Sequence, residues 1–361
     1  MTARRFSLPV LILVLTIASV RAEKVVLIAG GGTQPDGAKA TDAKVIQPFG
    51  VDFAPDGSLL LVEMTGGERL RKIAADGTIS TLAGTGKKGV PGDDGPGNMA
   101  TFNGMHNLII APDGGIYLAD TFNSRVRKFD LKTGAVSGFA GTGKKGFSGD
   151  GGPAAKAEFN QTICIAFGAG AKSMYVADIA NRRIRAIDMS TGVVTTVAGN
   201  GKSGEPKDGE LAVSQPLIDP RAVAADAKGN LYILERGGHR WRVVSPDGKI
   251  RTVAGTGKAG KGGDGGPALQ APLNGPKYLW CAKDGSVLIA DTENHQIRRY
   301  LPGKEIIELV AGTGKKGKGG IGGEPLKLEL NRPHGVIEHP TTGELYISDS
   351  DNNRVLKIVK E

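Results

Sequence analysis

A short motif returns at a nearly fixed interval along this chain, and the interval limits the possible folds to repeat architectures. The string Ala-Gly-x-Gly recurs at spacings of 54 to 58 residues in six copies, beginning at Ala29, Ala83, Ala140, Ala198, Ala254 and Ala311. A period of this length is typical of arrays in which each copy is one supersecondary unit. Six such units fill residues 23–361, so we expect one repeat domain and no second domain.

Within each unit, short apolar runs alternate with turns. In the second unit the runs at 107–111, 116–120, 125–130 and 135–140 are separated by Pro-Asp-Gly-Gly, Thr-Phe-Asn-Ser and Lys-Thr-Gly. Such runs between turn residues indicate antiparallel β-strands, and no stretch of ten or more residues has a helical period. The pattern predicts an all-β, six-bladed β-propeller with four antiparallel strands per blade, and it excludes a TIM barrel or a β/α solenoid.

The two ends of the repeat region are complementary. Residues 24–29 have the sequence of a fourth strand without three strands before it, whereas the last unit ends after its third strand. We therefore expect the N-terminal strand to close the last blade and to hide two sheet edges. The expected blades span approximately residues 31–84, 85–141, 142–199, 200–255, 256–312 and 313–361, with 23–30 completing the last one.

Residues 1–22 do not follow the repeat. Two arginines precede an apolar run at 8–18, and Ala22 lies at a position suited to cleavage. This pattern predicts a secretory signal peptide at 1–22 and a secreted or periplasmic mature chain. The run is shorter than the roughly 20 apolar residues of a membrane span, so we expect no stable membrane insertion.

The charge balance narrows the expected partners. The chain has 46 Lys and Arg against 37 Asp and Glu, for a formal net charge of +9. In an exported protein, a basic excess favours an anionic glycan, an acidic peptide or a cell-surface protein as the partner, and we expect no nucleic-acid binding. We expect the protein to be a monomer.

The second and third strands of several units share a recognisable string. It is clearest at Tyr117–Arg127, Tyr175–Asp178, Ile289–Arg298 and Tyr346–Val355. In these segments the chain resembles the NHL-repeat family of six-bladed propellers, although units one and four carry Glu63 and Glu235 where the others have Asp. The resemblance implies the fold and leaves the function open, because such propellers serve many roles.

One position just before each inner strand carries the candidate site. Alignment of the units places Phe49, His106, Ile163, Arg221, Lys277 and His334 there. Inner strands line the central channel of a propeller, so these residues should surround its mouth. We expect His106, Arg221, Lys277 and His334 to bind a carboxylate, sulfate or phosphate group. Ten lysines in the Gly-rich connections should lie on the same face.

A metal site is the alternative interpretation of the same residues. Some NHL-type propellers, the peptide-amidating lyases, hold zinc with three His from alternate blades, and His106 and His334 are similar to two of these. At the third position stands Arg221, which stays protonated and repels a metal ion. We therefore predict no catalytic residue and no cofactor, with zinc or calcium in the funnel as the alternative.

The sequence thus favours an exported, non-catalytic binding or scaffold propeller. It would recognise an anionic glycan, peptide or surface protein on the face that carries the Gly-Lys loops. A hydrolase or lyase, similar to propeller lactonases or amidating lyases and using a metal in the funnel, stays open as the second hypothesis.

Three further expectations concern structural residues. An acid ends the second strand of every unit. In five of the six units an Arg five or six positions later, such as Arg183 after Asp178, is expected to be its partner in an ion pair or turn hydrogen bond, whereas the fifth unit has Gln296 there. His239 and His295 are expected at the surface. Cys164 and Cys281 lie in apolar runs and are expected to be buried free thiols that do not meet.

Overall fold

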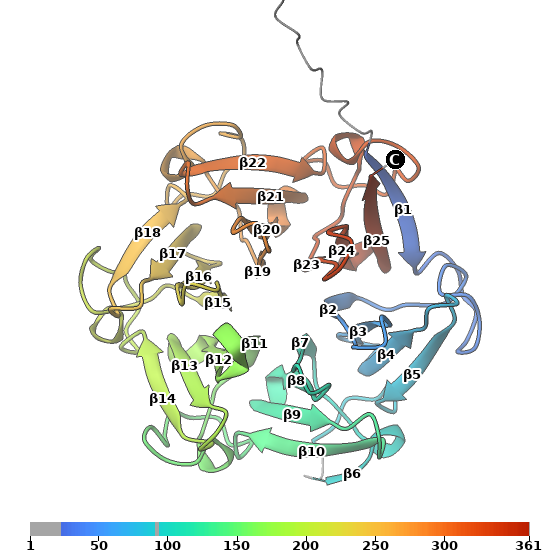
Figure 1. The fold of residues 1–361 in the computed structure, drawn as a ribbon, viewed down its shortest axis with the longest axis horizontal. Helices are drawn as coiled ribbons and strands as arrows, with labels where there is room; N and C mark the ends of the chain where they lie inside the picture. The colour runs from blue at the N-terminus through green and yellow to red at the C-terminus, as the bar shows by residue number, and fades with distance from the viewer. Residues whose placement is uncertain (1–22, 91–93, 361) are drawn as a thin grey trace, which may run out of the picture.

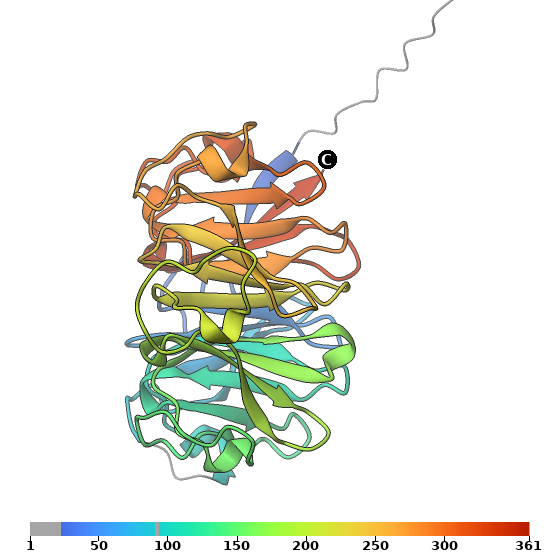
Figure 2. The ribbon, with the colours of Figure 1, turned by 90° about the vertical axis from the view of Figure 1, so that its left-hand side faces the viewer.

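The computed structural model describes residues 23–90 and 94–360, so the predicted signal peptide lies outside the described residues. Six β-sheets are arranged around a central axis, as Figure 1 shows. Figure 2 shows the ring from the side, with long connections gathered on one face and shorter turns on the other. No helix in the two described ranges is long and apolar enough to cross a membrane.

Each sheet has four antiparallel strands, and the predicted propeller is confirmed. From the axis outward the sheets contain β2 (Pro48–Phe53), β3 (Leu59–Glu63), β4 (Arg69–Ile73) and β5 (Ile79–Ala83); β7 (Met105–Ile110), β8 (Ile116–Asp120), β9 (Arg125–Phe129) and β10 (Ala135–Ala140); β11 (Thr162–Phe167), β12 (Ser173–Asp178), β13 (Arg183–Asp188) and β14 (Val194–Ala198); β15 (Pro220–Ala225), β16 (Leu231–Glu235), β17 (Arg240–Val244) and β18 (Ile250–Ala254); β19 (Tyr278–Cys281), β20 (Val287–Asp291), β21 (Gln296–Leu301) and β22 (Ile306–Ala311); and β23 (Gly335–Glu338), β24 (Leu345–Asp349), β25 (Arg354–Lys360) and β1 (Glu23–Ala29).

A short strand and several 3-10 turns lie outside the four-stranded sheets. The second sheet gains a three-residue outer strand, β6 (Asp94–Pro96), which pairs with β10. The helical elements of the described residues are single 3-10 turns: η1 (Gly97–Met99), η2 (Thr121–Asn123), η3 (Ala154–Lys156), η4 (Ala169–Ala171), η5 (Ile179–Asn181), η6 (Ala212–Ser214), η7 (Ala268–Gln270), η8 (Thr292–Asn294), η9 (Pro325–Lys327) and η10 (Ser350–Asn352).

The ring closes as the sequence predicts. Strand β1 pairs antiparallel with β25, with Val25 opposite Ile358 and Glu23 opposite Lys360. Figure 1 shows β1, drawn in blue, beside the red C-terminal strand. The pairing joins the first described residues to the last blade and removes two free sheet edges, which would otherwise be open to pairing with other chains.

The core lies between neighbouring blades. All five residues of β3 are buried, as are all five of β8, because a middle strand of each blade packs against the sheets on both sides. The buried clusters accordingly combine strands of adjacent blades, and Trp241, with no exposed surface, is the largest buried side chain. Burial of this apolar surface is the main source of stability.

The acid at the end of each second strand is buried, but the ion-pair partner predicted from spacing is wrong in blades two, three and four. Asp178 lies 3.6 Å from Arg185, whereas Arg183, at the start of β13, reaches the carbonyl oxygens of Asn181 and Asn200 at the rim. Arg185 lies two residues further along the same face of the strand and is completely buried beside Asp178. The same pairing joins Glu63 to Arg71, Asp120 to Arg127, Glu235 to Arg242 and Asp291 to Arg298. The predicted partner is found for Asp349, 2.7 Å from Arg354, and for Glu63, which also lies 3.9 Å from Arg69.

A second acid from the Gly-rich connection completes several of these pairs. Asp150 lies 2.6 Å from Arg185, and Asp264 lies 2.8 Å from Arg298. Each of these buried guanidinium groups therefore bridges two carboxylates, one in its own blade and one in the preceding loop. The connection is thereby tied to the blade that follows it.

A repeated hydrogen bond joins blade to blade. The residue that ends the second turn has a positive φ in every blade, and in five blades its side chain accepts an N–H from the next blade. His239 accepts from Gly275 at 3.1 Å and His295 from Arg332 at 3.0 Å. Both histidines are half-buried in these inter-blade bonds, so the expectation of simple surface positions is wrong. The last bond of the series crosses the closure of the ring, from the Gln47 N–H to Asn353 Oδ1 at 2.8 Å.

Candidate functional site

The six aligned residues lie at the starts of the inner strands, and all are at least nine-tenths buried. The ring of Phe49 stacks on His334 and meets His106 edge-on, with centroid separations of 4.0 and 5.1 Å. Lys277 Nζ lies 3.3 Å from His334 Nε2. Residues from blades one, two, five and six are therefore in mutual contact around the axis.

A cavity of about 410 Å³ opens between blades three and four, beside this cluster. Of the six aligned residues, His106, Ile163 and Arg221 line it. Arg182 and Arg236 also line this cavity, together with Asp219, and these three were not predicted as site residues. The alignment of the units does carry a signal for two of them, because Arg182 ends a second turn and Arg236 directly follows a second strand.

Arg221 is the chemically unusual residue of this cavity. It is 5% exposed, and it forms no hydrogen bond or ion pair with any residue that the structure describes; its Nε is fully buried without a partner. The nearby Asp219 is already paired with Arg236 at 2.6 Å. Burial, followed by the charge of Arg236, lowers the pKa of Arg221 to about 9, which leaves the group charged at neutral pH. A buried charge without a counterion is costly, so the cavity favours an anion.

Lys277, in contrast, has its own counterion. Its Nζ lies 2.7 Å from Glu293 Oε1, and Glu293 is also held by Arg332 at 2.8 Å. Burial is the main cause that lowers the pKa of Lys277 to about 8, against the opposing effect of Glu293. Lys277 therefore contributes less uncompensated charge to the channel than Arg221 does.

The two histidines are held as neutral imidazoles. His106 Nδ1 lies 2.8 Å from the Gly104 carbonyl oxygen and His334 Nδ1 lies 2.7 Å from that of Arg332, so each Nδ1 carries the proton and donates it. Burial and then the nearby cations hold the pKa of both imidazoles well below the usual range. Each Nε2 is left as an acceptor.

These residues fit a divalent metal ion poorly. No group of three or more His, Cys, Asp or Glu close enough to hold a metal occurs among residues 23–90 and 94–360. Arg221 and Lys277 also place positive charge beside His106 and His334, as the lowered pKa values of both histidines indicate. A catalytic zinc site needs three protein ligands, and this cluster offers two.

A second cavity lies at the opposite ends of the inner strands. Cys164 and Cys281 both line it. Neither forms a disulfide, and Cys164 is buried whereas Cys281 is partly exposed. The prediction of free thiols is confirmed, and full burial of Cys281 is wrong.

Six four-stranded blades, closed by the N-terminal strand, define the protein as a six-bladed β-propeller. Its repeated second and third strands resemble those of the NHL-repeat propellers, and similarity to proteins named NHL repeat-containing protein 2 supports this resemblance. No protein-family model matches the chain.

Two curated relatives show this similarity. The chain is 28% identical over 270 residues to suppressor of quenching 1, a chloroplastic protein of Arabidopsis thaliana, and 26% identical over 342 residues to NHL repeat-containing protein 2 of Gallus gallus. The matches cover 71% and 85% of this chain but 25% and 46% of those proteins. The chain thus spans less than half the length of these relatives.

Solved structures share the fold at low sequence identity. An auxiliary nutrient binding protein from Bacteroides ovatus superimposes with a TM-score of 0.67 at 16% identity, covering 94% of this chain and 77% of that one. A catalytically inactive variant of virginiamycin B lyase from Staphylococcus aureus superimposes with a TM-score of 0.51 at 12% identity, covering 90% and 82%. The fold therefore occurs in both binding proteins and enzymes.

Proposed function

We propose that this protein is an exported, non-catalytic binding propeller whose cavity between blades three and four holds an anionic group. The ligand class is a carboxylate, sulfate or phosphate carried by a glycan, a peptide or a surface protein. The observation that supports this proposal most strongly is the buried guanidinium of Arg221, which lacks a counterion among the described residues and lines an open cavity.

The surroundings of the cavity are suited to the same ligand class. Arg182 and Arg236 line it as well, so three guanidinium groups share it with one carboxylate, Asp219. Planar guanidinium groups bind carboxylate and phosphate oxygens in pairs of parallel hydrogen bonds. A single anionic group at Arg221 would supply the counterion that residues 23–90 and 94–360 do not.

The rim adds a weaker, longer-range contribution. The Gly-rich connections carry exposed lysines, at Lys87, Lys88, Lys144, Lys145, Lys202, Lys258, Lys261, Lys315, Lys316 and Lys318. Some of this charge is compensated, since Lys144 lies 2.8 Å from Glu158. Such a rim attracts a polyanion toward the mouth and weakens as salt rises.

Thermal unfolding in sodium sulfate, compared with sodium chloride at equal ionic strength, tests the proposal. Sulfate should raise the melting temperature of the natural protein because it binds only the folded state. The Arg221→Met variant should lose this specific increase. Arg251→Met, at an exposed arginine outside the cavity, should keep it.

Titration with glucuronate by calorimetry extends the test to a sugar carboxylate. Binding that is lost in Arg221→Met and kept in Arg251→Met supports the anion site. Absence of any sulfate or glucuronate effect on the natural protein, or equal effects on both variants, contradicts it.

The second hypothesis is a hydrolase or lyase that uses a metal in the same funnel. It is motivated by the unprotonated Nε2 atoms of His106 and His334 and by the fold shared with the virginiamycin B lyase. Elemental analysis of protein purified without chelator separates the two. Stoichiometric zinc or calcium that is lost in His106→Ala would favour the enzyme.

A further inference from the structure

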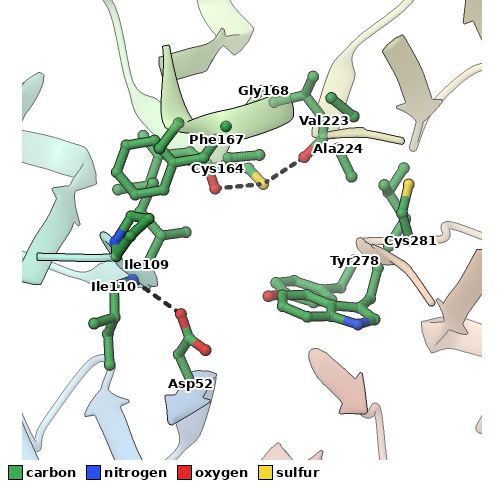
Figure 3. A pocket seen from close by; sticks show the side chains of 18 residues that line it. Asp52, Ile109, Ile110, Cys164, Phe167, Gly168, Val223, Ala224, Tyr278 and Cys281 are labelled. Carbon is green, nitrogen blue, oxygen red and sulfur yellow. Dashed lines mark hydrogen bonds between the residues drawn. The ribbon is translucent and has the colours of Figure 1, made fainter. Parts of the chain in front are cut away.

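The second cavity has a different chemistry from the first. It has a volume of about 360 Å³ and is lined by residues from the far ends of the inner strands, among them Ile110, Phe167, Val223 and Trp280. Figure 3 shows Asp52, Cys164 and Tyr278 on different sides of the same open space. The volume lies at the lower end of the range of small-molecule sites, and the lining is predominantly apolar and aromatic, as such sites are.

Asp52 is the one charged residue among the 18 that line this cavity. One carboxylate oxygen accepts the N–H of Phe53 at 2.8 Å, and the other accepts the N–H of Ile110, in the next blade, at 2.9 Å. Each oxygen retains a second acceptor site. No Lys, Arg or His within the described ranges forms an ion pair with Asp52, in contrast to the paired acids of the blades.

The repeat does not require an acid at this position. The residues that align with Asp52 in the other blades are Ile109, Ala166, Ala224, Trp280 and Ile337. A carboxylate therefore occurs once in an otherwise apolar layer. The inter-blade bond to Ile110 explains part of its role, as a similar bond from the Lys283 N–H explains Glu338, but Glu338 does not line this cavity.

The remaining polar groups of the cavity carry no charge near neutral pH. Burial raises the pKa of the Cys164 thiol to about 11 and raises the pKa of the Cys281 thiol and the Tyr278 phenol further. Burial also raises the pKa of Asp52 to about 7, because its two backbone hydrogen bonds offset only part of the desolvation. The cavity thus has a single, poorly compensated negative group.

A cross-channel contact separates this cavity from the cationic one. Asn107 Nδ2 lies 3.4 Å from the hydroxyl of Tyr278, in the blade on the other side of the axis, and Asn107 Oδ1 accepts the N–H of Ile165 at 2.9 Å. Figure 1 shows that β7 and β19, which carry these residues, face each other across the ring. The two cavities share no lining residue.

We propose that this second cavity binds a small organic ammonium ion, with the cationic head at Asp52 and an apolar or aromatic body against Phe167, Tyr278 and Trp280. The carboxylate accepts hydrogen bonds from the ammonium group, and the aromatic faces attract the cation further. The same protein would then hold an anion at one mouth of its channel and a cation at the other. The proposal does not depend on the anion site.

A charge series of one molecular shape tests this. Phenethylammonium, phenethyl alcohol and phenylacetate are titrated into the natural protein at pH 8, and binding is followed by the fluorescence of Trp280. Only two tryptophans occur in the chain, and the other, Trp241, is fully buried in the core. Phenethylammonium should bind about ten-fold or more tightly than the alcohol, and phenylacetate should not bind at this site.

Two variants complete the test. Asp52→Asn keeps the shape of the side chain and should weaken phenethylammonium binding about ten-fold while leaving the alcohol unaffected. Asp113→Asn, in the turn that follows β7 but outside the lining, is the matched control and should bind as the natural protein does. If Asp52→Asn fails to fold, the comparison of the three ligands on the natural protein still tests whether the cavity prefers a cation.

Three results would overturn the proposal: equal affinity for the ammonium and the alcohol, unchanged ammonium binding in Asp52→Asn, or no ammonium binding. Sulfate, compared with sodium chloride at equal ionic strength, provides a further check, because an anion in the opposite cavity should not change ammonium affinity. A larger loss of ammonium binding in sulfate than in chloride would count against two independent sites.

Discussion

The phenyl ring of Phe49 lies stacked on the imidazole of His334, with the two centroids 4.0 Å apart. This contact joins the inner strand of the first blade to that of the last. On its other side the imidazole lies beside Lys277, whose Nζ is 3.3 Å from Nε2. A proton added to His334 would therefore meet both an apolar surface and a cation. The folded protein consequently resists protonation of this histidine.

The pH dependence of stability should show this resistance. The pKa of His334 is held well below the usual range in the folded state, whereas in the unfolded chain it returns to about 6.5. Below pH 6.5 the unfolded state binds a proton that the folded state does not, so stability falls by about 1.4 kcal/mol per pH unit for this one group. His334→Asn should lose less stability than the natural protein between pH 6.5 and pH 5, by at most about 1.4 kcal/mol per pH unit.

Urea denaturation at several pH values measures this difference. Other titrating groups are common to both proteins and cancel in the comparison. At pH 8 neither state binds the proton, so the difference that remains there reports packing alone. Parallel pH profiles of the two proteins would contradict a neutral, buried His334.

The buried ion pairs predict a sharp contrast between two arginines of one strand. Arg185→Met leaves the buried Asp178 without its cation and should cost about 3 to 5 kcal/mol of unfolding free energy. Arg183→Met, two residues earlier, removes bonds to carbonyl oxygens at the rim and should cost about 1 kcal/mol. Chemical denaturation gives both values, and a larger loss in Arg183→Met would restore the pairing inferred from spacing.

Ring closure should be needed for the protein to remain monomeric. Removal of residues 23–29 deletes β1 and exposes the edge of β25, whose backbone N–H and C=O groups would then be free to pair with other chains. We expect a lower melting temperature and concentration-dependent oligomers in light scattering. A monomeric truncation with unchanged melting would show that the closing strand is dispensable.

Arg221 should reduce stability in the absence of ligand. Arg221→Met replaces an uncompensated buried charge with an apolar chain of similar length, so in sulfate-free buffer the variant should be about 1 to 3 kcal/mol more stable than the natural protein. Thermal and urea unfolding at low ionic strength measure this gain. A strongly destabilised variant would instead assign Arg221 a structural role.

The fold could be predicted almost completely, because the same pattern of strands and turns occurs in all six units. The spacing of the motif indicated the number of blades, and the lone strand at 24–29 indicated the closure that β1 and β25 form. The ion-pair partners could not be predicted from spacing, because residues such as Arg183 and Arg185 lie on one face of one strand and differ only in depth. How far each side chain lies from the rim depends on packing between neighbouring blades, and the sequence of one strand does not show this packing.

The candidate site could be predicted in part. Alignment of the units placed His106, Arg221, Lys277 and His334 in one layer, and the structure brings them to one mouth of the channel. The alignment did not distinguish Lys277, which Glu293 neutralises, from Arg221, which has no counterion among the described residues. Asp52 stands in the alignment as one acid among apolar residues, which marks the position but does not indicate the cavity around it.

The series of inter-blade hydrogen bonds has one vacancy. Five of the residues that end the second turns offer an acceptor to the next blade, but the sixth, Arg182, has only donors to offer. That junction, between blades three and four, is also where the cavity of Arg221 opens. An anion bridging Arg182 and Arg221 would supply at this junction the inter-blade link for which Arg182 has no acceptor, so that ligand binding would also complete the series of bonds around the ring.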